Sequence, residues 1–464
     1  MDMEALPLKL SVGRDEDRIS ALPDELLLRI LERLDLPEAV RAGAVSKRWR
    51  HLPHQLSLLT LHISRSQVET MDAFTAALMS AACPPADRNC ECQRSRAIQF
   101  QALRLGFYLS APHLTSIGSA VADVVTHGKT KCLEFRICPP PGDYTVTQYA
   151  DFGEQFMSFS RACQVAFRWL TRLCLKNLVF GDTDVTDLIT ACDKLECLTL
   201  RSCTLVDEHS ALKIDTPCSG LEELEFIHFV CARIELISVP KLRRVSCFGW
   251  RFENPPVRFD CVPELRDVDF GCRARTWQAP FVLSECLSRS VPNLSKLHLD
   301  FFGQMIWIQP EQSKQLTGIF GNLTDVRLLA IFPECDLSWT LFILEAAPAL
   351  QSLSLSRDRH SCVTFEDTAE KTNVVWEPSK DLKHLNLKVL QISGFKEEGK
   401  VANYIRLVMK CAEGLKRIVL LGELRLCKNC NDRERKGQVD EARRRRVKEQ
   451  LARGSSSSVE LIIR

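Results

Sequence analysis

No stretch of the sequence is apolar over the roughly 18 residues that a membrane-spanning helix requires. The first 17 residues contain five acidic side chains and lack the basic start and apolar centre of a secretory signal. The formal net charge is only +2, so the whole molecule has no strong field for nucleic acid or an anionic membrane. These absences predict a protein of the cytoplasm or nucleus, with no membrane partner.

The sequence also lacks G-x-x-x-x-G-K-[ST], G-x-G-x-x-G, H-E-x-x-H and G-x-S-x-G, and its ten histidines are scattered. One catalytic pattern is present: "DTDVT", from Asp182 to Thr186, has the form used by aspartyl-nucleophile phosphatases. There the first Asp attacks a phosphoryl group and the second, here Asp184, acts as acid and base. Because a helix should begin here, Asp182 or Asp184 as its N-cap is the simpler explanation. We predict a non-enzyme without a cofactor.

The 21 cysteines are odd in number and many lie in apolar stretches, which favours buried free thiols over a disulfide framework. Cys83, Cys90 and Cys92 form one cluster and Cys427 and Cys430 another. Zinc requires four ligands, usually as two close pairs, and neither cluster has its second pair. We therefore predict no metal site.

A repeated pattern, L-x-x-L-x-L with conservative changes, occupies most of the chain. Successive copies begin about 25 residues apart, as is typical of leucine-rich repeats. The copies start at Leu170, Leu195, Leu221, Leu242, Leu265, Leu294, Leu323, Leu350, Leu387 and Leu415.

Each copy predicts one short strand, since its last two apolar residues alternate with polar ones. Leu198 and Leu200 should face the core and Thr199 solvent. One such strand cannot bury its apolar side alone, so stacked copies should form a parallel sheet. Residues 184–194 have helical spacing and predict a helical return; where the period is short, we expect irregular returns. The fold class is thus α/β, a leucine-rich-repeat solenoid whose exposed strand face suits protein binding.

The N-terminal region predicts three short helices. Pro23 suits a first helical turn, and Leu26, Ile30 and Leu34 then recur at i, i+4 and i+8. Residues 35–37 break this helix, Pro37 opens a second one, and Ser46 is a candidate cap for a third. About forty residues make a poor independent core, so the unit should leave apolar surface to a partner or cap the solenoid.

"ISALPDELLLRILERLDLPEAVRAGAVSKRWRHL", residues 19–52, resembles an F-box, and residues 384–422 resemble the FBD domain of plant F-box/leucine-rich-repeat proteins. The resemblance implies the substrate-recognition subunit of a Skp–cullin–F-box ubiquitin ligase. Its F-box would bind a Skp-family adaptor and thereby cullin, and its repeats an unidentified protein substrate. The alternative is an interaction scaffold acting outside the ligase. The adaptor-facing residues implied by the resemblance are Leu22, Pro23, Leu26, Ile30, Leu34, Val45 and Trp49.

The tail from Arg433 to Arg453 has nine basic against four acidic residues. It predicts either a nuclear localisation signal or nucleic-acid contact, or else a solvated helix. No aromatic residues interleave the basic ones, which disfavours single-strand binding.

The predicted organisation has six parts. They are a flexible N-terminus (1–17), the F-box (18–56), an irregular linker or early repeats (57–165), the repeat solenoid with a polar inserted loop after Leu350 (166–380), the FBD domain (381–422) and a basic flexible tail (423–464).

Overall fold

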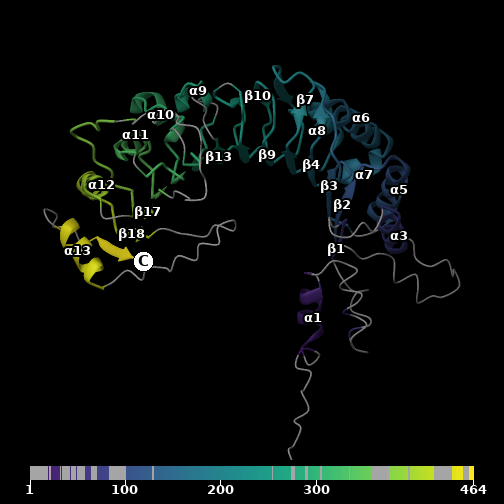
Figure 1. Ribbon diagram of the computed structural model, residues 1–464, viewed down its shortest axis with the longest axis horizontal. Coiled ribbons are helices and arrows are strands. Elements are labelled where there is room, and N and C mark those ends of the chain that lie inside the picture. The colour runs from purple at the N-terminus through teal and green to yellow at the C-terminus, as the bar shows by residue number, and fades with distance from the viewer. Residues whose placement is uncertain are drawn as a thin grey trace, which may run out of the picture. The chain divides into compact units, whose positions relative to one another are not determined.

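The computed structural model of the 464-residue chain places strands where the repeats begin (Figure 1). It describes residues 19, 22–31, 33, 42, 49, 58–63, 71–82, 101–127, 130–252, 254–272, 277–287, 291–303, 306–333, 335–357, 374, 376–395, 398–422, 441–452 and 459–464. Most of the predicted second and third F-box helices, residues 358–373 of the predicted inserted loop, and both cysteine clusters lie outside these residues.

The chain divides into two compact units. The first comprises residues 1–107 and 116–134, and the second residues 108–115 and 135–464. Helix α5 (Ala111–His127) and strand β3 (Cys132–Cys138) both extend across the division in sequence.

The first unit contains helix α1 (Asp24–Leu31) and a small strand–helix arrangement. Strands β1 (Leu58–His62) and β2 (Ala102–Tyr108) pair in parallel, and helix α3 (Met71–Ala82) connects them. The rings of Phe74 in α3 and Phe107 in β2 lie 5.8 Å apart. The described part of segment 57–165 therefore contains strand–helix units. Its copies are hard to recognise because long helical returns, such as α5, stretch the period.

The second unit is built on a long parallel sheet with one strand for each of the ten predicted copies. Every strand begins two residues after the first leucine of its copy. The strands neighbour one another in the order β4 (Arg172–Lys176), β6 (Cys197–Arg201), β9 (Glu223–Ile227), β11 (Arg244–Phe248), β13 (Asp267–Gly271), β14 (Lys296–Asp300), β15 (Asp325–Leu329), β16 (Ser352–Ser356), β17 (Val389–Ser393) and β18 (Arg417–Leu421). The predicted α/β solenoid is confirmed.

The core of this unit is a double row of strand side chains. In β6, Leu198 and Leu200 are buried and Thr199 is half-buried on the opposite face, as predicted. Because the strands pair in register, the second and fourth residue of each strand stack on their counterparts in the next, for example Leu198 on Leu224. Alternation of side chains along a strand thus becomes a continuous apolar layer across the repeats.

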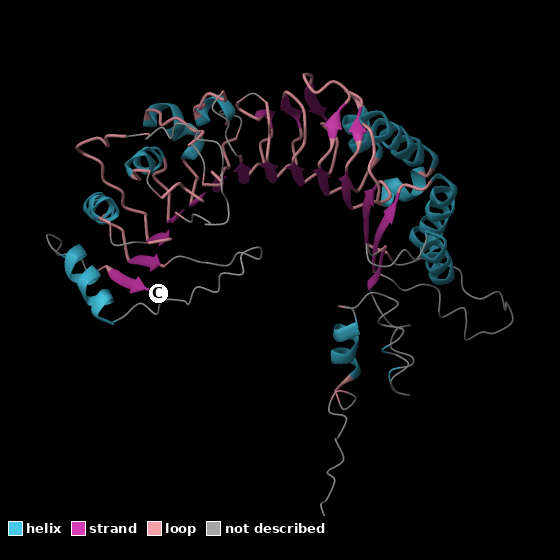
Figure 2. Ribbon diagram, viewed as in Figure 1, coloured by secondary structure: helices cyan, strands magenta, loops and turns pink. Residues whose placement is uncertain are grey.

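The return segments cover the other side of this layer (Figure 2). In this unit the helical ones are α6 (Val146–Ala162), α7 (Gln164–Trp169), α8 (Asp184–Ala191), α9 (Leu283–Cys286), α10 (Ser313–Phe320), the 3-10 turn η2 (Ser338–Thr340), α11 (Leu341–Ala346) and α12 (Gly399–Cys411). The predicted helix after Asp182 is confirmed as α8, whose Val185, Leu188 and Ile189 are buried.

Between Leu221 and Leu265, where the copies are shortest, the returns contain strands and not the irregular segments that we expected, and the preceding return does so as well. β8 (Ala211–Asp215), β10 (Arg233–Ser238) and β12 (Val257–Cys261) form a second parallel sheet, and β5 (Val179–Phe180) pairs with β7 (Thr204–Leu205). A strand advances about 3.3 Å per residue and a helix about 1.5 Å. An extended return therefore covers the same distance with about half the residues.

The described residues of the predicted basic tail form a helix and a strand. Strand β19 (Glu460–Ile463) extends the long sheet by pairing with β18. Helix α13 (Glu441–Ala452) buries Val447 and Leu451, which are four residues apart, while Arg445 and Arg446 are exposed. We did not predict this apolar pair, because basic residues dominate the segment. Residues 381–422 contain strands β17 and β18, which continue the same sheet, and helix α12, which lies between them in sequence.

Candidate protein-interaction surfaces

Helix α1 has two apolar sides. Its first turn carries Asp24 and Glu25, which are favourable near the positive end of the helix dipole. Leu27 and Leu31 are fully buried at 0% exposure. Because i and i+4 lie on the same helix face, this pair forms one side of α1.

The other side of α1 presents large apolar side chains to solvent. Leu26 is 44% exposed and Ile30 is 40% exposed, again an i, i+4 pair. Exposed apolar side chains next to one another mark a contact surface more strongly than single ones do. The helix therefore separates an inward pair from an outward pair.

The predicted adaptor-facing residues divide between these two sides. Leu22 and Trp49 are half-buried and pack with Leu28 and Ala42 against the buried pair of α1, so they belong to the interior of this small domain. Pro23 is exposed beside the outward pair. Leu34 and Val45 lie outside the described residues. Sequence reasoning missed the role of Leu27 and Leu31, although their spacing signalled a second helix face.

The exposed face of the long sheet is a second candidate surface. The first, third and fifth residues of each strand lie on it, opposite the apolar core layer. Along the first and third positions, opposite charges meet across strands. Arg172 lies 3.6 Å from Glu223, and Arg417 lies 2.8 Å from Glu460.

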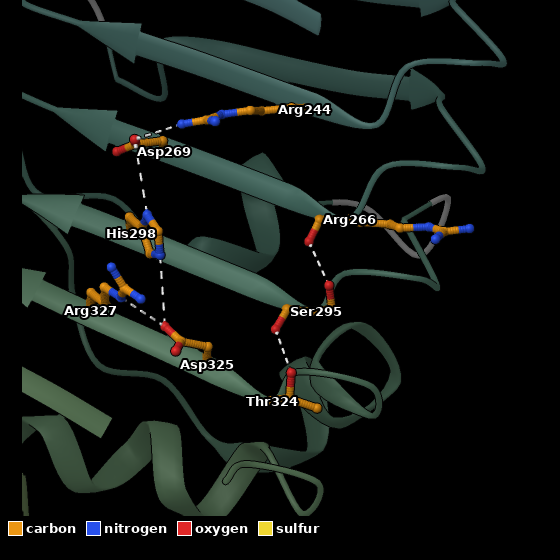
Figure 3. A network of polar contacts seen from close by, with 8 residues as sticks. All are labelled: Arg244, Arg266, Asp269, Ser295, His298, Thr324, Asp325 and Arg327. Carbon is orange, nitrogen blue, oxygen red and sulfur yellow. Dashed lines mark hydrogen bonds and ion pairs between the residues drawn. The ribbon is translucent and has the colours of Figure 1, made fainter. Parts of the chain in front are cut away.

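The centre of this face carries a continuous chain of charged contacts (Figure 3). Arg244 lies 3.8 Å from Asp269, which lies 4.0 Å from His298 Nδ1. His298 Nε2 lies 3.7 Å from Asp325, and Arg327 donates to the same carboxylate at 3.1 Å. These residues come from the adjacent strands β11, β13, β14 and β15. The two arginines of this chain therefore balance the charges of its two aspartates.

The two aspartates of this chain differ in their electrostatics. Contact with His298 and the Arg327 guanidinium holds the pKa of Asp325 below its ordinary value. Burial raises the pKa of Asp269, and its neighbours His298 and Arg244 compensate only in part. The charged form is thus favoured at Asp325 and disfavoured at Asp269.

Asp325→Asn is expected to lower the free energy of unfolding at pH 7 by about 0.5–1 kcal/mol, whereas Asp269→Asn should leave it unchanged or raise it. A lowered folded-state pKa stabilises above the unfolded value, near 3.9, and this contribution is lost as pH falls through the folded pKa. The deficit of Asp325→Asn should therefore begin to shrink below about pH 4 and disappear only below the folded-state pKa. Urea unfolding of wild type and both variants measures this, and equal losses in the two variants would contradict it.

The phosphatase-like stretch lies at the start of α8. Asp184 is the first helical residue, and its Oδ2 accepts from the Gly181 N–H at 2.7 Å while Oδ1 lies 3.9 Å from Arg161. Asp182 is exposed. The N-cap is Thr183, without a side-chain cap bond, so the expectation of an aspartate cap was wrong. Asp184 instead stabilises the preceding turn, which is a structural role.

Burial determines the chemistry of the cysteines in the described repeats. Thiols such as Cys192, Cys203 and Cys231 are buried and free, and desolvation raises the pKa of each to about 12. Such thiols are poor nucleophiles and poor metal ligands. Within the described ranges, no three potential metal ligands come together. In the same ranges, no helix has the length and apolarity to cross a membrane.

Two family models match the regions that carry the two candidate surfaces. The family model described as At1g61320/AtMIF1, LRR domain, matches residues 155–456, and the F-box-like model matches residues 19–58. Neither is the model of an enzyme. The repeat model extends over the segment that resembles an FBD domain, and no FBD model is among these matches.

Three Arabidopsis thaliana relatives illustrate the similarity. F-box/FBD/LRR-repeat protein At3g51530 is 24% identical over 55% of this chain and 52% of its own length. F-box/FBD/LRR-repeat protein At1g51370 is 22% identical over 85% of this chain and 87% of its own. F-box protein At1g80960 is 42% identical over 12% of each chain. The matched region thus spans about half of the first relative and most of the second.

Proposed function

Because the chain belongs to the family of plant F-box/leucine-rich-repeat proteins, we propose that it is the substrate-recognition subunit of a Skp–cullin–F-box ubiquitin ligase. In this proposal the F-box binds a Skp-family adaptor and, through it, cullin. The repeats bind the protein to be ubiquitinated. The chain contributes proximity and orientation and no catalytic group. Such a ligase would act in the cytoplasm or nucleus.

The observation that carries the proposal is the outward pair of α1. Leu26 and Ile30 are exposed on a helix whose neighbouring face, formed by Leu27 and Leu31, is fully buried. Burying the exposed two-fifths of each side chain in an interface contributes about 0.6–1.2 kcal/mol each. We infer that these two residues, with Pro23, Leu34 and Val45, contact the adaptor. Leu22 and Trp49 support that surface from within.

The exposed strand face supports the second half of the proposal. It is a continuous surface, and its polar side chains differ from strand to strand. Solenoids commonly use such extended faces for binding. The substrate is a protein that matches this face.

Reconstitution tests the proposal directly. The full chain, co-expressed with a plant Skp-family adaptor, is expected to elute with it as one complex during size-exclusion chromatography and to retain cullin added afterwards. If the chain is folded by circular dichroism but binds no Skp-family adaptor, the ligase proposal is wrong. A scaffold acting outside the ligase would then be the better explanation.

A further inference from the structure

The fifth position of the central strands forms a row distinct from the charged positions. Ile227, Phe248, Gly271, Asp300 and Leu329 pair in register across β9, β11, β13, β14 and β15. Four of these five residues carry no charge. The row lies on the same exposed face as the charged contacts in Figure 3, at the carboxyl ends of the strands.

Gly271 allows two aromatic rings to approach the middle of this row. A Cβ atom on Gly271 would lie 2.4 Å from Phe248 Cδ1 and 3.1 Å from Phe302 Cε2. Both rings therefore lie against the strand at the place where a side chain would stand. Phe302 reaches this position from a left-handed turn directly after β14, with φ of 52°. Both rings remain half-exposed.

Asp300 borders the two rings. It pairs with Gly271 across the strands, and its Oδ1 accepts from the Phe302 N–H at 2.8 Å. Its carboxyl group is largely withdrawn from water, and burial raises its pKa. Among the described residues, no basic side chain forms an ion pair with Asp300, whereas Asp269 and Asp325 each contact a cation. A partly desolvated carboxylate beside aromatic faces thus lacks a cation from the described part of the chain.

We propose that Phe248, Phe302 and Asp300 form an aromatic–acidic patch that binds an arginine or lysine side chain of the recruited protein. This inference rests on the proposed function and adds the chemistry of its substrate. An aromatic face attracts a cation through its quadrupole, and a guanidinium can stack on it. A carboxylate at the rim adds a charge-assisted hydrogen bond. The occupant is a basic residue flanked by apolar side chains, which would lie over Ile227 and Leu329.

The surrounding charges favour the same occupant. Asp269 lies two residues before Gly271 on the same face of β13, and its contacts with Arg244 and His298 already belong to the charged chain. Rim charges set specificity and association rate more than affinity. The aromatic pair should therefore supply most of the affinity, and Asp300 the preference for a positive charge.

Random peptides displayed on phage and selected on the purified full chain test this inference. Selected peptides should be enriched in arginine or lysine next to apolar residues. A synthetic peptide from the selection should bind Asp300→Asn at least about tenfold more weakly than wild type. Asp215→Asn, an exposed carboxylate on the second sheet, is the matched control and should bind like wild type.

Two further measurements keep the outcome interpretable. Asn at position 300 can still accept from the Phe302 N–H, and Phe248→Leu removes a ring while keeping apolar bulk, so one variant remains if the other misfolds. Adaptor binding, measured on the same samples, should be unchanged in both variants, which separates this inference from the ligase proposal. Selection of no basic peptides, or equal binding to wild type and Asp300→Asn, would overturn it.

Discussion

Leu26→Asp and Ile30→Asp are each expected to weaken binding to a Skp-family adaptor by at least about 30-fold while the chain stays folded. Both side chains are about two-fifths exposed in the free chain, so a carboxylate there remains hydrated. In the complex the same carboxylate would be buried against an apolar surface without a partner, which costs several kcal/mol. Titration of labelled adaptor with each purified variant measures the loss.

Leu27→Asp is the matched control for this prediction. It makes the same chemical change one residue away, but Leu27 is fully buried with Leu31. A charge there should unfold the small N-terminal domain and leave the repeats intact, as limited proteolysis would show. If Leu26→Asp instead unfolds the domain, or binds the adaptor as wild type does, the outward pair is not the adaptor surface.

The sequence alone predicted the strands of the repeat region because each strand is encoded locally. Alternation such as Leu198, Thr199, Leu200 determines which side chains face the core, and stacking of copies determines the sheet. The return segments were less predictable. Short stretches such as residues 211–215 can be strand or irregular from their pattern alone, and their pairing with residues 233–238 decides.

The candidate site was predictable in position but not in detail. The leucines of α1 all fit a helical stripe, and only packing shows that Leu27 and Leu31 face inward while Leu26 and Ile30 face outward. The aromatic–acidic patch has no sequence signature, because Gly271 and Phe302 come from different repeats. Their proximity depends on strand register, which no single repeat contains.

Gly153→Ala is expected to lower the stability of the second unit by about 3 kcal/mol. Gly153 is a buried residue of α6, and a Cβ there would lie 1.8 Å from the Val179 carbonyl oxygen. The added methyl group would meet backbone atoms of Val179, so no flexible side chain can move to relieve the clash. α6 would have to move away from β5 and separate Phe156 from Phe180, whose rings lie 6.4 Å apart.

Gly318→Ala provides the opposite expectation for the same substitution. Gly318 lies on the exposed side of α10, with no atom within 4 Å of its would-be Cβ. Alanine there should raise stability by about 0.5–1 kcal/mol, because it restricts the unfolded chain and favours helix. Thermal melting of the two variants beside wild type should therefore shift in opposite directions. A Gly153→Ala variant that melts with wild type would mean that α6 does not approach β5 through this glycine, and that the long helical return can be displaced without loss to the repeats it covers.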